Sequence, residues 1–113
     1  MLPDMHRQAA EELEAAVAAI QADAQFARLV IEGRWAAAFH WIAYRTQTQH
    51  GRHQDSHARL GTFLRSLGEA ASAEVWERLD QVRQGGLYGT KTSTPEVQLS
   101  AKLLGDIRTW ALS

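Results

Sequence analysis

The sequence predicts an all-α protein, an up-and-down helical bundle of about five helices that forms a single domain over residues 1–113. Three observations support this prediction. Apolar residues recur at the three- and four-residue spacing of amphipathic helices, and no stretch of β-branched residues alternates with the two-residue period of a strand. Glycine, proline and capping residues separate the helical stretches at short intervals.

The first helix is expected to begin near Asp4, which is a favourable N-cap residue. Gly33 is its expected end, because glycine commonly stops a helix. A break around residues 23–25 is the alternative. The residues predicted to form its apolar face are Leu13, Val17, Ile20, Ala24, Ala27 and Ile31.

The second helix is predicted over about residues 34–49, with Gly51 in the position that follows a helix end. Nearly every residue from Trp35 to Tyr44 is apolar, so this half should be buried on most sides at the centre of the bundle. His40 lies within this apolar half, where a buried histidine needs a partner. The four tryptophans of the chain are interpreted as core or interface residues.

A third helix is predicted to start with Asp55 or Ser56 as its cap and to end at Gly68. The next helix follows over about residues 69–84, and so short a turn makes the two helices antiparallel neighbours. Their predicted inward residues are Leu60, Phe63, Leu64, Leu67, Val75, Leu79 and Val82, with Trp76 beside them.

Residues 85–94, GGLYGTKTST, are predicted to form the one long loop. The last helix then starts either with a capping box of Ser93 and Glu96 or with Thr94 as the cap and Pro95 in the first turn. Its predicted apolar stripe consists of Val97, Ala101, Leu104, Ile107 and Ala111.

Composition excludes several classes of protein. The absence of cysteine excludes disulfides and thiolate chemistry and fits a cytoplasmic protein. The longest apolar run is about ten residues, roughly half the length of a membrane-spanning helix, so no membrane association is expected. The first residues are charged, so the sequence predicts no secretory signal.

The net charge of −1 argues against a domain that binds nucleic acid strongly, but the charge is uneven along the chain. Residues 1–32 hold six acids and two arginines, a balance of −4, whereas residues 33–68 hold five arginines and one aspartate, a balance of +4. The basic middle segment either offers a phosphate or partner surface or pairs with the acidic first helix. We favour the second interpretation.

Two short motifs suggest chemistry, and neither is specific. His50, His53, Asp55 and His57 have ligand types that suit zinc, but they span a helix end, a loop and a helix start, so nothing holds them convergent. Arg83 and the glycines after it could approach an anion, although the simpler interpretation is a helix stop. The sequence predicts no metal and no cofactor, and it contains no nucleophile elbow, zincin motif or Walker loop.

The order of elements resembles the HEPN family of small prokaryotic helical domains. The resemblance covers about residues 25–113 and rests on the aromatic, alanine-rich stretch 35–43, on residues 56–60 (Ser-His-Ala-Arg-Leu), on Arg83-x4-Tyr88 and on the Thr-Pro-Glu restart at residue 94. It implies a bundle that usually forms a homodimer and that associates with nucleotides or RNA. It also implies a nucleotidyltransferase partner in a toxin–antitoxin pair.

Active members of the family are metal-independent ribonucleases with an arginine followed, after four to six residues, by a histidine. Here the matching pair is Arg83 and Tyr88, and a tyrosine with a pKa near 10 is a poor acid–base group at neutral pH. We therefore favour a non-catalytic module that binds a nucleotide, RNA or a protein. The candidate binding residues are Arg45, His50, Arg52, His57, Arg83 and Tyr88.

Two alternatives stay open. Arg45 with His50, or Arg52 with His57, matches the arginine–histidine spacing and would make the protein a ribonuclease at a different helix junction. In the other alternative the chain is a structural module without a ligand, whose role is set by a partner protein.

Overall fold

The computed structural model describes residues 1–20, 24–88 and 94–113. Within these ranges it contains five α-helices, one short 3₁₀ helix and no strand, so the all-α prediction is confirmed. The elements are α1 (Pro3–Ala19), η1 (Ala24–Phe26), α2 (Ala27–His50), α3 (His57–Ser66), α4 (Ala70–Tyr88) and α5 (Thr94–Ala111).

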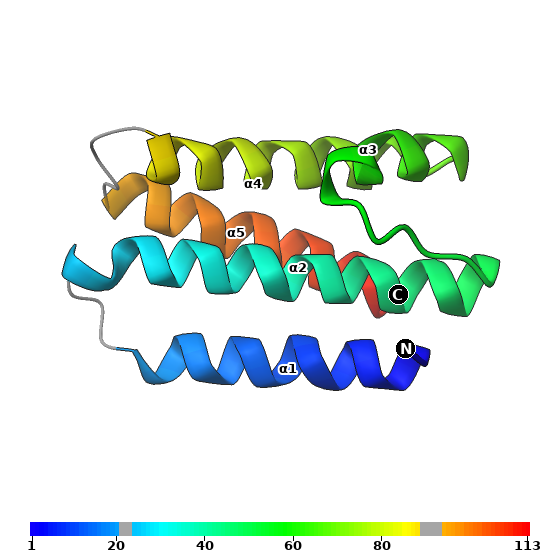
Figure 1. The fold of residues 1–113 in the computed structure, drawn as a ribbon, viewed down its shortest axis with the longest axis horizontal. Coiled ribbons are helices and arrows are strands. Elements are labelled where there is room, and N and C mark those ends of the chain that lie inside the picture. The colour runs from blue at the N-terminus through cyan, green and yellow to red at the C-terminus, as the bar shows by residue number, and fades with distance from the viewer. Residues whose placement is uncertain (21–23, 89–93) are drawn as a thin grey trace.

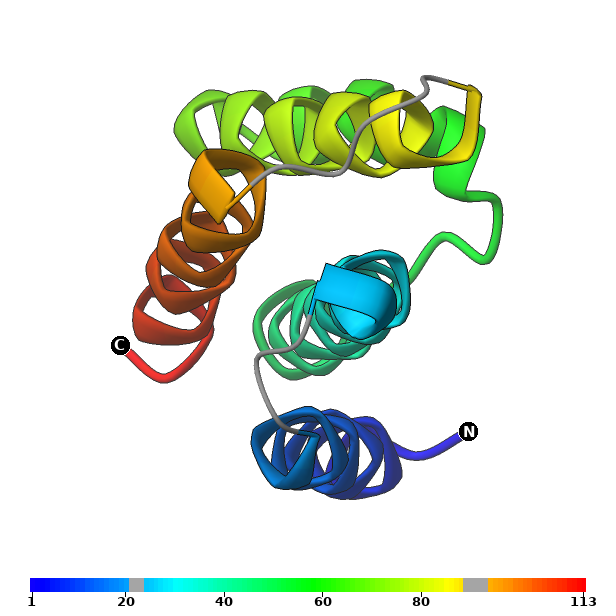
Figure 2. The ribbon, with the colours of Figure 1, turned by 90° about the vertical axis from the view of Figure 1, so that its left-hand side faces the viewer.

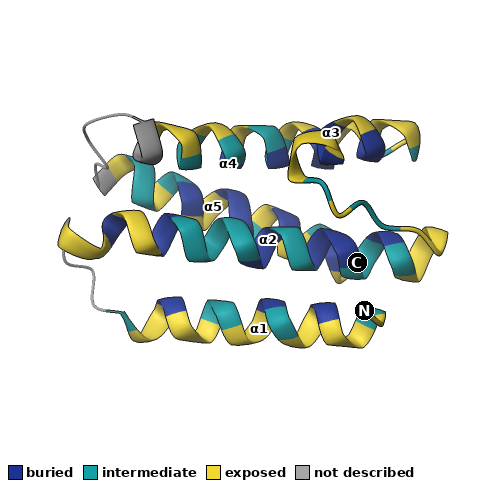
Figure 3. Cartoon of the chain, in the orientation of Figure 1, coloured by how far each residue is buried: buried dark blue, intermediate teal, exposed yellow. Residues whose placement is uncertain are grey.

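The central element is α2, as predicted (Figures 1 and 2). Helix α1 packs along one side of α2 and α4 lies on the opposite side, while α5 packs on a third side of α2 and also contacts α4. The short α3 packs on α4. Figure 3 shows that the buried residues of α1 lie on the side that faces α2.

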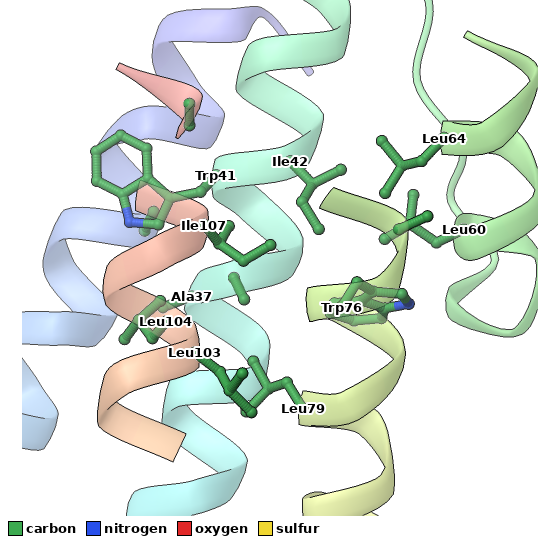
Figure 4. Close-up of a cluster of buried hydrophobic side chains, with 14 of the residues drawn as sticks. Ala37, Trp41, Ile42, Leu60, Leu64, Trp76, Leu79, Leu103, Leu104 and Ile107 are labelled. Atoms are coloured by element: carbon green, nitrogen blue, oxygen red, sulfur yellow. The ribbon is translucent and has the colours of Figure 1, made fainter. Parts of the chain in front are cut away.

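The hydrophobic core follows α2 on both sides (Figure 4). Trp41 lies towards α1 and α5, whereas Ile42 points towards α3 and α4. Both side chains are buried, at 2% and 0% exposure. The other large core side chains, from α3, α4 and α5, are Leu60, Leu64, Trp76, Leu79, Leu103, Leu104 and Ile107. Burial of this set from water is the main stabilising contribution.

The first helix starts within one residue of the predicted start near Asp4, but its predicted end at Gly33 is wrong, and the alternative of a break before α2 agrees with the structure. Helix α1 starts at Pro3, with Leu2 as the backbone cap, and Asp4 lies inside the first turn, where its carboxylate suits the positive end of the helix. The helix ends at Ala19, so the chain breaks between α1 and α2, and residues 21–23 lie outside the described ranges.

Gly33 does not stop a helix but lies inside α2, because α1 and α2 approach closely there. A Cβ atom at this position would lie 2.6 Å from Cγ2 of Val17. Glycine is therefore present for its small size, and its helix-breaking tendency of about 1 kcal/mol is offset by the contact that it permits.

The glycines predicted at the two turns around α3 have the expected backbone conformation, but the predicted side-chain cap of α3 is absent. Gly51 and Gly68 have φ values of 67° and 80°, the left-handed conformation that glycine adopts without strain. Ser56 is the residue before α3, but its side chain makes no capping hydrogen bond. Asp55 instead forms an ion pair with His53, at 3.0 Å.

Helix α4 continues through residues 85–88, so the predicted loop starts too early. The N–H groups of both glycines can donate within the last turns of the helix, although their carbonyl groups are among the last four of α4. Residues 89–93, the rest of the predicted loop, lie outside the described ranges, as does Ser93 of the proposed capping box. Helix α5 begins at Thr94, within one residue of both predicted starts, and the residue before it lies outside the described ranges.

The predicted apolar stripe of α5 is wrong at Ala101, which is exposed, while Leu103 and Ser100 are fully buried. At 3.6 residues per turn, Ala101 lies about 100° around the helix from Ser100. It therefore lies at the edge of the buried face. No helix within the described ranges combines the length and apolarity that crossing a membrane requires.

The glycines in α2 and α4 give a direct test of this packing. We expect Gly33→Ala to lower the free energy of unfolding by about 1–3 kcal/mol, because the stiff Val17 side chain blocks the added methyl group. Gly85→Ala is the matched control, since a Cβ there meets nothing within 4 Å, and it should raise stability by about 0.5–1 kcal/mol. Urea denaturation measures both, and equal effects would contradict the close α1–α2 contact.

Candidate functional site

Two of the six candidate residues, His57 and Arg83, meet at the ring of Trp35. The guanidinium carbon of Arg83 lies 4.1 Å from the centroid of the Trp35 ring. The ring of His57 approaches it edge-on, with the centroids 5.3 Å apart. Helices α2, α3 and α4 therefore converge at Trp35, which the sequence spacing alone does not show.

The charge around Arg83 does not favour an anionic ligand. Its Nε atom lies 3.8 Å from Asp80 and 3.9 Å from Glu32, and the side chain is only 15% exposed. Asp80 also accepts a 2.9 Å hydrogen bond from Nε1 of Trp35. Two carboxylates thus face one guanidinium, and a phosphate there would be repelled.

The Trp35 ring is also unsuited to stacking with a base. Arg83 lies over it, and Trp76 stacks with it at 5.5 Å between centroids. This cluster is accordingly a packing junction of three helices. For Tyr88 the structure places the backbone at the end of α4, and its side chain lies outside what is described.

Arg45 and His50 make separate contacts near the C-terminus. Nη1 of Arg45 donates hydrogen bonds to the carbonyl oxygens of Ser113, at 2.6 Å, and Trp110, at 3.3 Å. Nε2 of His50 lies 4.0 Å from Glu69, which also accepts a 3.0 Å hydrogen bond from the Trp110 indole. A cation beside carbonyl oxygens at a helix end is a favourable structural contact.

Arg52 and His57, the second pair with the arginine–histidine spacing, contact different aromatic rings. The guanidinium of Arg52 lies 5.5 Å from the ring of Phe63, whereas His57 lies against Trp35. The structure therefore places five of the six candidates in three regions, and the side chain of the sixth, Tyr88, lies outside what is described.

The interpretation that the basic middle segment pairs with the first helix is largely wrong. Arg65 forms a two-pronged ion pair with Glu77 of α4, at 2.7 Å for both bonds, and this pairing lowers the pKa of Glu77. Arg45 contacts the end of α5. Among the described residues, Arg34 is the one arginine of the segment that interacts with α1, through the charge of Glu14. The segment was expected to meet α1 because the charges are complementary, but chain connectivity places most of it beside α4 and α5.

Arg52 and Arg59 differ from these arginines. Both are exposed, and neither has a carboxylate within ion-pair distance among the residues that the structure describes. The nearest acid in sequence, Asp55, is paired with His53. Arg59 belongs to the basic segment but was not among the six candidates. The sequence alone does not distinguish Arg59 from Arg65, because it does not show which arginines form ion pairs.

A cluster of histidines is the main feature that the sequence did not reveal. His6 of α1 and His40 of α2 share a hydrogen bond between their Nδ1 atoms, at 2.9 Å, so one Nδ1 donates and the other accepts. The ring of His53 lies 5.7 Å from that of His6, and His53 is paired with Asp55. The prediction of a partner for His40 is confirmed. His6 could have been found by extending the α1 face backwards, since residues 6, 10, 13 and 17 share one helical face.

Burial and the neighbouring histidines lower the pKa of His6 to about 4. The causes, largest first, are burial, the charge of His40 and the charge of His53. Burial also lowers the pKa of His40. The lowered pKa values favour the neutral form of both rings at pH 7, and the shared hydrogen bond requires at least the accepting ring to be neutral.

The histidines and the aspartate considered as metal ligands divide among separate contacts. His50 faces Glu69, His53 pairs with Asp55, and His57 lies against Trp35. In the described part of the chain, no three histidine, aspartate or glutamate residues are placed to hold a metal ion.

Comparisons with models of protein families, with curated proteins and with solved structures found no match to this chain.

The histidine cluster predicts a loss of stability in mild acid. The unfolded chain has the ordinary histidine pKa of 6.5, and folding lowers the pKa of His6 to about 4, so between these values the unfolded state binds the extra proton. The full stability is present above pH 6.5 and is lost as the pH falls towards 4. At about 1.4 kcal/mol per pH unit, this amounts to at most about 3.5 kcal/mol.

Urea denaturation between pH 7 and pH 4.5 measures this loss. We expect His6→Asn, whose amide keeps a group near the Nδ1 position, to flatten the pH dependence. His57→Asn replaces an exposed histidine and should keep the wild-type dependence. A wild-type slope in His6→Asn would show that other groups cause the acid sensitivity.

Proposed function

We propose that this protein is a non-catalytic, HEPN-like module that binds RNA or a nucleotide through phosphate groups. The binding surface consists of residues 52–59, which form the loop between α2 and α3 and the first turn of α3. The observation that carries the proposal is the pair of exposed arginines, Arg52 and Arg59, that lack a carboxylate partner among the described residues. The resemblance to HEPN domains supplies the class of ligand.

The local charge favours phosphate despite the net charge of −1. Arg52, His57 and Arg59 are all exposed on this surface, and Asp55 is exposed beside them, with its carboxylate 3.0 Å from His53. Two arginines against one aspartate leave residues 52–59 with a charge of +1, and contacts between arginines and phosphate oxygens dominate affinity for RNA. Arg45 and Arg83, by contrast, lie against carbonyl oxygens or carboxylates.

Binding is favoured over catalysis by the placement of the two arginine–histidine pairs. Acid–base cleavage of a phosphodiester needs a histidine and an arginine at one phosphate group. Arg45 and His50 have different partners near the C-terminus: Arg45 donates to the carbonyl groups of residues 110 and 113, whereas His50 faces Glu69. Arg52 and His57 contact different rings.

A double substitution tests this surface. We expect Arg52→Ala with Arg59→Ala to weaken binding of a short fluorescein-labelled single-stranded RNA on the order of tenfold at low salt. Because each arginine is expected to neutralise one phosphate, the slope of log affinity against log salt should fall by about 1.4. Fluorescence anisotropy at several salt concentrations measures both quantities.

The matched control is Arg28→Ala with Arg78→Ala, which removes two other exposed arginines and changes the net charge equally. It should bind RNA nearly as the wild type does. Equal weakening by both double variants would mean that only net charge matters, and no binding by the wild type would refute the proposal. RNA cleavage in EDTA that is lost in His57→Ala or His50→Ala would favour the ribonuclease alternative.

The homodimer and the nucleotidyltransferase partner stay predictions from the resemblance. Light scattering at tens of micromolar protein distinguishes a dimer from a monomer.

A further inference from the structure

A groove of about 280 Å³ lies where α1, α2 and α5 meet, away from residues 52–59. Its apolar lining consists of Val17, Ala18, Ala101 and Leu104. Its charged lining consists of Glu14 from α1, Arg34 from α2 and Arg108 from α5. Figure 2 shows α1 and α5 on neighbouring sides of α2.

Arg34 is held in this groove by neutral groups. Its Nη1 atom donates hydrogen bonds to the carbonyl oxygen of Val97, at 2.8 Å, and to Oγ of Ser100, at 3.0 Å. No carboxylate lies within ion-pair distance of its guanidinium among the described residues. Burial lowers the pKa of Arg34, and the charge of Glu14 only partly opposes this effect. The guanidinium is therefore fixed in position, partly removed from water and short of negative charge.

Glu14 does not supply that charge because both of its oxygens have other partners. One oxygen forms the ion pair with Arg108 that joins α1 to α5. The other accepts a 2.6 Å hydrogen bond from the indole of Trp41. Two arginines and one glutamate leave the groove with a charge of +1.

We propose that this groove binds a small organic anion, a carboxylate or a phosphate monoester with an apolar body. Arg34 pairs with the anionic group, and Val17 and Leu104 pack against the apolar part. An arginine fixed by hydrogen bonds loses little freedom on pairing, and its planar group suits both kinds of anion. Charge complementarity and the apolar lining together set this class of ligand.

The size of the groove limits the ligand. A volume of about 280 Å³ corresponds to roughly nine water molecules at about 30 Å³ each, and it falls at the small end of ligand sites. It suits a compound with a single ring or a short chain and excludes an oligonucleotide. The proposal is thus separate from the RNA surface at residues 52–59.

Benzoate and phenyl phosphate are suitable probes, and benzamide is the neutral counterpart of benzoate. We expect isothermal titration calorimetry to show saturable binding of at least one anion and at least tenfold weaker binding of benzamide. The stronger of the two anions distinguishes a carboxylate site from a phosphate site. No saturable binding of either anion, or equal binding of benzamide, would overturn the proposal.

Substitutions on one helix locate the site. Ala18→Phe fills the groove from its exposed wall and keeps both arginines, so it should weaken anion binding at least tenfold. Ala16→Phe adds the same ring at an exposed position of α1 outside the lining and should bind as the wild type does. Arg34→Gln should also weaken anion binding. If Arg34→Gln does not fold, the affinity of Ala18→Phe alone tests whether the groove is the site. Equal affinities in the two phenylalanine variants would refute the groove as the site.

The two proposals fail independently. Arg52→Ala with Arg59→Ala should leave benzoate and phenyl phosphate binding unchanged, and Ala18→Phe should leave RNA binding unchanged.

Discussion

Close packing around the alanine-rich centre of α2 is the constraint on which the other helices depend. Ala37 and Ala38 are fully buried, and their small side chains let the neighbouring helices approach. Trp41 and Ile42, one turn further on, fill the space on opposite sides of the helix. Because protein interiors are packed as densely as organic crystals, these positions fix the distances at which the other helices are placed.

The polar features of the molecule lie where the burial of α2 is incomplete. Arg34 faces the space between α1 and α5, Trp35 meets α3 and α4, and His40 meets α1 beside the loop to α3. At each of these three positions, the polar side chain either contacts another group of the protein or has no opposite charge within ion-pair distance. The uncompensated charges, and not the total of basic residues, distinguish a candidate ligand surface from a structural contact.

The sequence predicted the helices and the centre of the bundle, because period and composition are local signals. It did not predict the roles of Gly33 and Ala101, since both depend on how closely another helix approaches. The meeting of His57 and Arg83 at Trp35, and that of His6 with His40, join residues far apart in the chain, which spacing cannot reveal. The separation of the two arginine–histidine pairs likewise follows from long-range contacts of Arg45 and Arg52.

Helix α1 is attached to the rest of the bundle mainly through α2, with the Glu14–Arg108 pair as a bridge to α5. The helix supplies His6 to the histidine cluster at one end and Glu14 and Val17 to the groove further along. Displacing α1 would therefore remove a histidine from the cluster and lining residues from the groove at the same time, so that one helix completes two otherwise separate features.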